Sequence, residues 1–178
     1  MEKSKIRKKI IKLRKKNYSK NLKINFQSII KILRKKKYKK KIFGGYYPHN
    51  YEVNMIPILE KFEKLNYVIS LPKIGKRHNM NFFVWSINDP LEINRYGIPE
   101  PITNKIVYPD ILLVPLVAYD RYRNRIGYGG GFYDRYIKKI KKIKKVLTIG
   151  AAFSYQKVKK IPIEKNDIKL DFIISEKN

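Results

Sequence analysis

The spacing of apolar and polar positions predicts three helices in the first third of the chain. Ile6, Ile10 and Leu13 recur at helical spacing and form one apolar stripe. Ser19, a residue type that caps helices, precedes a second stripe. That stripe consists of Leu22, Phe26, Ile29, Ile30 and Leu33. A third helix is expected from Asn54, as its cap, to Leu65, because Pro57 is tolerated in a first turn. We expect the first two helices to pack on a sheet.

Short apolar runs later in the chain predict strands. They lie at 41–47, 67–71, 82–87, 111–114, 146–152 and 171–175. The segment 88–105 is rich in Pro, Asn and Gly and is expected to be a loop that lies over a site. Strands that alternate with helices imply crossover connections. The pattern therefore predicts an α/β fold: a single three-layer α/β/α domain, residues 1–178, with a mostly parallel central sheet.

A glycine-rich turn follows the run at 111–114. Gly127, Gly129, Gly130 and Gly131 allow positive φ or a close approach of the backbone to a ligand. Apolar residues at helical spacing come next, so the predicted order is strand, glycine turn, helix. The start of such a helix offers free N–H groups and the positive end of its dipole, which suits a phosphate.

Two familiar phosphate motifs are absent from this turn. A dinucleotide fingerprint would need glycine where the chain has Phe132, and no Gly-Lys-Ser/Thr follows. Without a known motif, a glycine-rich turn can equally be a turn without a ligand.

Composition excludes some classes of site. The chain has no cysteine, which rules out disulfides and thiolate zinc sites. Its histidines, His49 and His78, stand alone and are not expected to bind metal. No apolar run approaches the ~20 residues needed to cross a membrane, and the lysine-rich start lacks a secretory apolar stretch. We expect a soluble, cytoplasmic protein that does not bind membranes.

The formal net charge is +28, from 42 basic and 14 acidic residues. Such a charge, with interleaved tyrosines, is typical of nucleic-acid binding. Here the lysines are spread along the whole chain and avoid the apolar face of 137–145, which favours a solvated surface. The positive field would still attract polyanionic substrates such as ATP.

The segment 125–134, RIGYGGGFYD, resembles the signature of 5-formyltetrahydrofolate cyclo-ligases, also called methenyltetrahydrofolate synthetases. Val114, Pro115 and Asp120 precede it as they do in that family. Further matching positions occur in the same order along nearly the whole chain: Lys3, Arg7, Tyr51, Glu52, Val53, Leu71, Pro72, Met80, Asn81, Phe82, Pro99, Glu100, Pro101, Phe153, Gln156, Pro162, Glu164, Asp167 and Asp171.

Two positions depart from the family pattern. The family usually carries glycine after the Val-Pro pair and before the Asn-Arg pair, where this chain has Leu116 and Arg123. A Cβ at a position that needs positive φ costs about 1 kcal/mol or more. We therefore expect backbone strain at both positions.

The resemblance implies ATP-dependent conversion of 5-formyltetrahydrofolate to 5,10-methenyltetrahydrofolate, with ADP and phosphate as the other products and a phosphorylated formyl (imidate) intermediate. It implies Arg125 and Tyr133 as catalytic residues, and Asp134 and Asp167 as ligands of Mg²⁺. It assigns ATP binding to Lys3, Arg7, Arg125, Ile126, Gly127, Tyr128, Gly129, Gly130, Gly131, Phe132 and Tyr133. It assigns folate binding to Tyr47, Glu52, Tyr128, Gly129, Gly130, Gly131 and Phe132.

Each assigned residue also has a structural interpretation. Lys3 and Arg7 share one helix face and can be solvated surface. Arg125 can brace Asp120, and Asp134 can serve only the first turn of its helix. In the same way, Asp167 can cap a helix, Tyr47 can be core and Glu52 a first-turn acid. Packing is the favoured interpretation of Trp85 and Tyr96, while Glu100, between two prolines, can face either ligand.

Three functional classes remain open from the residues. The first is the cyclo-ligase, acting as a monomer on small molecules without specific nucleic-acid binding. The second is a basic RNA-binding protein. The third is an enzyme of similar layered architecture that handles sugar phosphates or coenzyme A and has no need of Glu52 and Tyr47.

Overall fold

The structure is a computed structural model that describes residues 2–19, 21–38, 41–76 and 79–177. His78 lies outside the described residues. Within them, the main sheet has seven strands in the order β11-β10-β7-β1-β2-β3-β6. They are β1 (Ile42–Gly44), β2 (Val68–Ile74), β3 (Met80–Val84), β6 (Ile106–Val107), β7 (Ile111–Pro115), β10 (Leu147–Ala151) and β11 (Phe172–Ile174). Pairing is parallel from β11 to β2 and antiparallel for β3 and β6, so the predicted mostly parallel sheet is confirmed.

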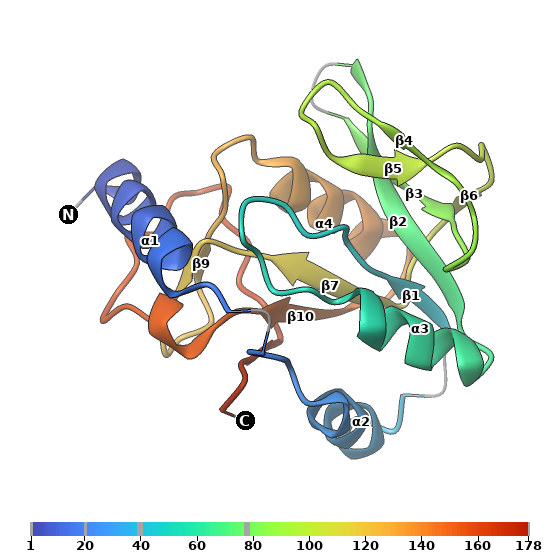
Figure 1. The fold of residues 1–178 in the computed structure, drawn as a ribbon, viewed down its shortest axis with the longest axis horizontal. Coiled ribbons are helices and arrows are strands. Elements are labelled where there is room, and N and C mark those ends of the chain that lie inside the picture. Colours follow the sequence, from blue (N-terminus) through green and yellow to red (C-terminus); the bar gives the residue numbers. More distant parts are fainter. Residues whose placement is uncertain (1, 20, 39–40, 77–78, 178) are drawn as a thin grey trace.

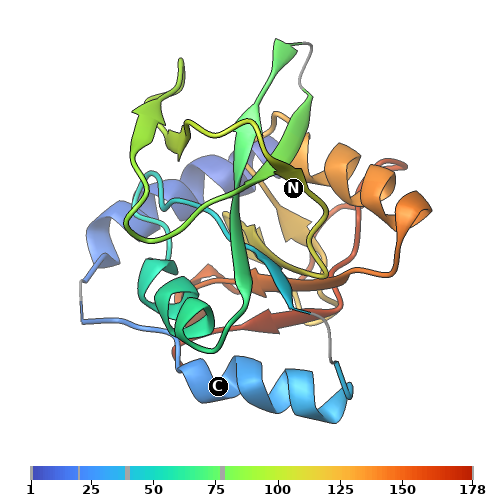
Figure 2. The same ribbon diagram turned by 90° about the vertical axis from the view of Figure 1, so that its right-hand side faces the viewer.

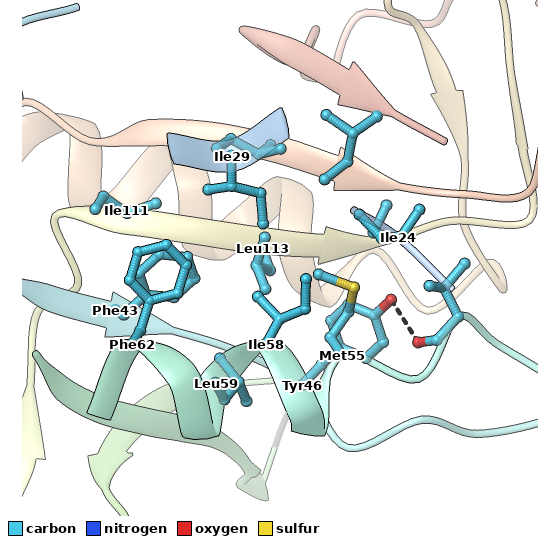
Figure 3. Packing of buried hydrophobic residues seen from close by; sticks show 14 of the residues in the cluster. Ile24, Ile29, Phe43, Tyr46, Met55, Ile58, Leu59, Phe62, Ile111 and Leu113 are labelled. Carbon is cyan, nitrogen blue, oxygen red and sulfur yellow. Dashed lines mark hydrogen bonds between the residues drawn. The ribbon is translucent and has the colours of Figure 1, made fainter. Parts of the chain in front are cut away.

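Helices cover both faces of this sheet (Figures 1 and 2). On one face, α2 (Phe26–Lys35) and α3 (Ile56–Lys64) bury Ile29 and Phe62 against β1 and β7. Figure 3 shows this core, in which the rings of Phe43 and Phe62 stack with centroids 4.3 Å apart. On the other face, α4 (Phe132–Ile143) buries Ile137 and Ile140. The three-layer α/β/α architecture is confirmed.

The first helix packs on a different sheet from the second. α1 (Lys3–Asn17) lies beside a separate two-stranded ribbon of β8 (Ala118–Tyr119) and β9 (Arg125–Ile126) (Figure 1). Ile6 and Ile10 are buried with Ala118, Ile126 and Ile161 in a cluster of their own. Both N-terminal helices therefore pack on a sheet, as predicted, but α1 packs on this two-stranded ribbon and not on the main sheet. The same ribbon separates β7 from the glycine turn, which does not follow the strand directly.

Helix starts differ from the predicted caps. α2 begins at Phe26, where Asn25 Oδ1 accepts the N–H of Gln27 at 2.9 Å, while the hydroxyl of Ser19 accepts the N–H of Asn21. Leu22 consequently lies outside the helix. Asn54 does satisfy a donor of α3, the N–H of Ile56 at 3.0 Å, although Met55 is the N-cap.

The segment 88–105 is more ordered than the predicted loop. It contains a hairpin of β4 (Leu91–Ile93) and β5 (Pro99–Pro101). Asn94 Oδ1 accepts the N–H groups of Tyr96 and Ile98 in its turn. Glu100 is buried and accepts hydrogen bonds from the Asn94 amide and from the N–H of Ile74 in β2. These bonds attach the hairpin to the main sheet. Glu100 therefore fixes the position of the hairpin that covers the site.

Candidate active site

A cavity of about 1020 Å³ lies where the carboxyl ends of β1 and β7 meet the glycine turn. This edge of a parallel sheet is where α/β proteins bind ligands. Every residue assigned from the family resemblance lines it: Lys3, Arg7, Tyr47, Glu52, Arg125, Ile126, Gly127, Tyr128, Gly129, Gly130, Gly131, Phe132, Tyr133, Asp134 and Asp167. The fold thus brings together segments that are up to 164 positions apart.

The glycine loop, residues 127–131, connects β9 to α4. Gly129 has φ +107° and Gly131, the N-cap of α4, has φ +64°, so a side chain is disfavoured at both positions. Gly127 has no positive φ, and a Cβ there would meet no atom within 4 Å. The loop therefore presents backbone, and the N-terminus of α4 with it, to the cavity.

Two cations of α1 reach this loop and its surroundings. Lys3 Nζ lies 2.5 Å from Asp167 and 3.1 Å from Glu164, and its side chain is 15% exposed. Burial opposes the charge on Lys3, but the two carboxylates outweigh that effect and raise its pKa. Arg7 Nε donates to the carbonyl of Gly127 at 2.7 Å. Solvated surface is therefore the wrong interpretation for Lys3 and Arg7.

Arg125 is a buried cation of the same region. Its Nη1 donates to Asp134 Oδ1 at 2.8 Å and to the carbonyl of Ile168. Asp120 accepts instead from backbone N–H groups of its own turn and from Ile161. The alternative in which Arg125 braces Asp120 is therefore wrong, and the guanidinium is held at the start of α4.

Asp134 and Asp167 suit Mg²⁺ as partners of a nucleotide. Among the residues that the structure describes, no group of three or more His, Cys, Asp or Glu could hold a metal by itself. Mg²⁺ commonly takes one or two carboxylates together with phosphate oxygens. The hydrogen bonds to Asp134 both reach Oδ1 and those to Asp167 both reach Oδ2, so the other oxygen of each carboxylate accepts none of these bonds.

Glu52 defines the opposite side of the cavity. It is 6% exposed, and its Oε2 accepts the N–H of His49 at 2.9 Å. Burial raises the pKa of the Glu52 carboxyl to about 7, against the opposing effects of the His49 bond, the Arg14 charge and a hydrogen bond from Tyr128. Because α3 begins only at Ile56, the interpretation of Glu52 as a first-turn acid is wrong.

Tyrosines supply the remaining polar surface. Tyr47 is half-buried and lines the cavity, whereas its neighbour Tyr46 is the core residue. The hydroxyl of Tyr133 is buried and has no hydrogen-bond partner among the described residues. Burial raises the pKa of Tyr133 well above its ordinary value, so the phenol stays protonated and can donate to a ligand.

Two aromatic residues named in the sequence differ in role. Trp85 is buried in the main core, as packing predicts. Tyr96, at the tip of the β4–β5 hairpin, instead lines the cavity, and its ring meets the edge of Phe132 with centroids 6.2 Å apart. The hairpin thus lies over the glycine loop.

Several residues near the site have no sequence feature that would identify them as site residues. Asn94, Arg135, Lys138 and Asn166 line the cavity, and His49 contributes its backbone. Arg14 is fully buried behind it. A signal for Arg14 does exist: it lies seven residues after Arg7 and therefore near the same helix face as Lys3 and Arg7.

Comparison with known proteins gives the family of the chain. The family model of the 5-formyltetrahydrofolate cyclo-ligase family matches residues 1–176. The 5-formyltetrahydrofolate cyclo-ligase of Escherichia coli K12 is 33% identical over 131 residues, which cover 70% of this chain and 71% of the relative. That of Mycoplasma genitalium is 35% identical over 130 residues, 72% of this chain and 68% of the relative.

Solved structures extend the similarity to the fold. The 5,10-methenyltetrahydrofolate synthetase of Aquifex aeolicus superposes with a TM-score of 0.76 at 29% identity, covering 100% of this chain and 91% of that one. The synthetase of Mycoplasma pneumoniae gives a TM-score of 0.73 at 25% identity and covers 99% of both chains. No helix in the described residues has the length and apolar character to span a membrane. The chain belongs to the 5-formyltetrahydrofolate cyclo-ligase family.

Proposed function

We propose that this enzyme converts 5-formyltetrahydrofolate and ATP to 5,10-methenyltetrahydrofolate, ADP and phosphate. One observation carries the proposal: a single cavity joins a cation-rich glycine loop at the N-terminus of α4 to a buried carboxylate flanked by tyrosines. The first surface suits a triphosphate. The second suits the N–H groups and the flat ring of a pteridine.

In the proposed reaction, the formyl oxygen attacks the γ-phosphorus of ATP, and the bond between that phosphorus and the ADP oxygen breaks. N10 of the folate then attacks the formyl carbon. The phosphate leaves with the C–O electron pair, N10 loses its proton, and the ring closes. Phosphorylation is needed because an amide-like oxygen is a poor leaving group. The protein mainly has to position the two substrates and neutralise charge.

The cations at the glycine loop would neutralise the phosphates. Arg125 lies at the start of α4 in its ion pair with Asp134, and Lys3 and Arg7 reach the same cavity from α1. The protonated phenol of Tyr133 can donate to the oxygen that gains charge. Asp134 and Asp167 would hold Mg²⁺ together with phosphate oxygens. When bound, the ion supplies positive charge that reduces the repulsion between the phosphates and the attacking oxygen.

Glu52 and Tyr47 would hold the folate. The ionised carboxylate of Glu52 can accept hydrogen bonds from the amino and N–H groups of the pteridine, and aromatic faces can stack on its ring. We also propose that the protein acts as a cytoplasmic monomer and binds no specific nucleic acid.

The test is to follow the ultraviolet absorbance of the methenyl product. We expect product only when ATP, 5-formyltetrahydrofolate and Mg²⁺ are all present. Asp134→Asn should abolish most of the turnover in protein that still folds, although the bond to Ile168 can persist with an amide oxygen. The melting temperature should fall as well, because the buried Arg125 loses its carboxylate partner. Absence of ATP-dependent product from folded protein would contradict the proposal.

A further inference from the structure

Arg14 of α1 is a fully buried guanidinium outside the cavity lining. Its Nη2 donates to the hydroxyl of Tyr128, and its Cζ lies 5.4 Å from the centroid of that ring. Its Nη1 makes a long contact of 3.4 Å with the carbonyl of Leu116, and its Nε has no hydrogen-bond partner among the described residues. The guanidinium therefore contacts the glycine loop chiefly through one side chain, Tyr128.

Burying this charge is costly unless another charge compensates it. Glu52 is also buried, and the charge of Arg14 and a hydrogen bond from Tyr128 both lower the pKa of its carboxyl, which burial raises. The Tyr128 hydroxyl, which has one hydrogen to donate, also lies 3.3 Å from the carbonyl of His49, so these two acceptors share it. Tyr128 thus connects a buried cation on α1 to the segment 49–52.

We propose that Arg14 is a positioning residue that fixes Tyr128, and through it the glycine loop, against the segment of Glu52, so that the folate side of the cavity is formed before the folate binds. The role in folate binding rests on the proposed function. The role in ordering the loop does not.

Arg7 and Arg135 hold this loop by its backbone, through the carbonyls of Gly127 and Gly130, and Tyr128 adds an attachment through a side chain of the loop itself. Glycine at 127, 129, 130 and 131 leaves the backbone many alternative conformations, and a ligand that had to order them would bind more weakly. Tyr128, in the middle of these glycines, is the large side chain by which the loop can be held. Tyr128 is 40% exposed, and its hydroxyl makes the bonds to Arg14 and His49 that attach it.

The test compares Arg14→Met, Tyr128→Phe and the double variant with wild type. Lys12→Met, at an exposed position of the same helix, is the matched control. In the protein without ligand, we expect Arg14→Met to lower the backbone amide order parameters of residues 127–131 measured by NMR relaxation, because the loop loses an attachment. Binding of 5-formyltetrahydrofolate without ATP should weaken about tenfold, and binding of ATP should weaken as well, because the same loop is proposed to hold the phosphates. The double variant should lose less than the sum of the two single effects, because both single changes remove the bond between Arg14 and Tyr128.

Unchanged order parameters at 127–131 in folded Arg14→Met would overturn the inference, as would additive effects in the double variant. Should Arg14→Met fail to fold, Arg14→Lys, which keeps the charge, must give an intermediate decrease in these order parameters. If wild type binds no 5-formyltetrahydrofolate, the proposed function fails, while the order parameters still decide the role of Arg14 because their measurement needs no ligand.

Discussion

The two sides of the cavity satisfy their charges in different ways. On the proposed nucleotide side, Lys3 is paired with Asp167 and Arg125 with Asp134, so these two cations have carboxylate partners before any phosphate arrives, while Arg7 donates to the carbonyl of Gly127. On the folate side, Glu52 is buried with a raised pKa and has backbone and phenol donors in place of a direct cation partner.

This difference indicates how each ligand would bind. A triphosphate that binds with Mg²⁺ can replace these ion pairs. The phosphates would then pair with the cations, and the Mg²⁺ ion would bind the carboxylates. The total charge then stays balanced. A pteridine would instead supply donors to a carboxylate that is costly to ionise in the empty site. Nucleotide binding should therefore be sensitive to the loss of a charged side chain, and folate binding should be sensitive to pH.

The largest expected effect follows from Arg125→Met. Loss of this cation should lower kcat/KM about 100- to 1000-fold, because it removes a fixed charge beside the reacting phosphate. Rates of methenyl formation measure it. The variant should also lose stability, since Asp134 is left unpaired. Arg125→Met with Asp134→Asn should regain that stability without regaining activity. Activity that returned with stability in this double variant would contradict the proposed roles of both Arg125 and Asp134.

Gly127→Val should raise the KM for ATP about 10- to 100-fold, because the new side chain would occupy space next to the phosphate site. A substitution at Gly127 should not disturb the protein itself, since its Cβ would meet no protein atom within 4 Å. Gly130→Val is a poorer probe, because its Cβ would lie 2.6 Å from the ring of Phe132 and disturb the protein itself. An unchanged KM in folded Gly127→Val would remove Gly127 from the nucleotide site.

The folate side should respond to pH through Glu52. Its carboxyl has a pKa of about 7 in the free enzyme, so kcat/KM for 5-formyltetrahydrofolate should fall about tenfold per pH unit below that value. Glu52→Gln should be less active and should lack this dependence. A wild-type profile that is flat between pH 5 and 8 would contradict the role of the ionised carboxylate.

Stability should depend on Glu52 in the opposite sense. The folded pKa of about 7 lies above the ordinary value of 4.5, so the folded state holds the proton more tightly than the unfolded chain. The free energy of unfolding should therefore fall as the pH rises from 4.5 to 7, by at most about 3 kcal/mol. Denaturant unfolding of wild type and Glu52→Gln at several pH values measures this difference.

The smallest effect on activity is expected for residues that lie outside both sides of the cavity. Arg123 has φ +69°, so Arg123→Gly should raise the free energy of unfolding by up to about 1 kcal/mol and leave both KM values unchanged. Leu116 is not among the positive-φ residues and is buried, so Leu116→Gly should instead destabilise by about 3 kcal/mol or more. Melting curves of both variants test this contrast. The expectation of strain was thus right for Arg123 and wrong for Leu116.

Local sequence determined much of this protein. Apolar runs predict β7 and β10, and helical spacing predicts α4 after the glycines, because periodicity and glycine content act within a few residues. The ordered motif predicts the family and a set of residues that line one cavity. Their roles in binding and catalysis stay predictions.

Only the tertiary structure decided which charges are buried and with what they pair. The packing of α1 on the β8–β9 ribbon, the burial of Arg14 behind Tyr128 and the choice of Asp134 over Asp120 by Arg125 join segments far apart in the chain. The raised pKa of Glu52 likewise depends on the surroundings that exclude water from it. Burial and charge pairing are properties of the assembled neighbourhood, so no short window of sequence contains them.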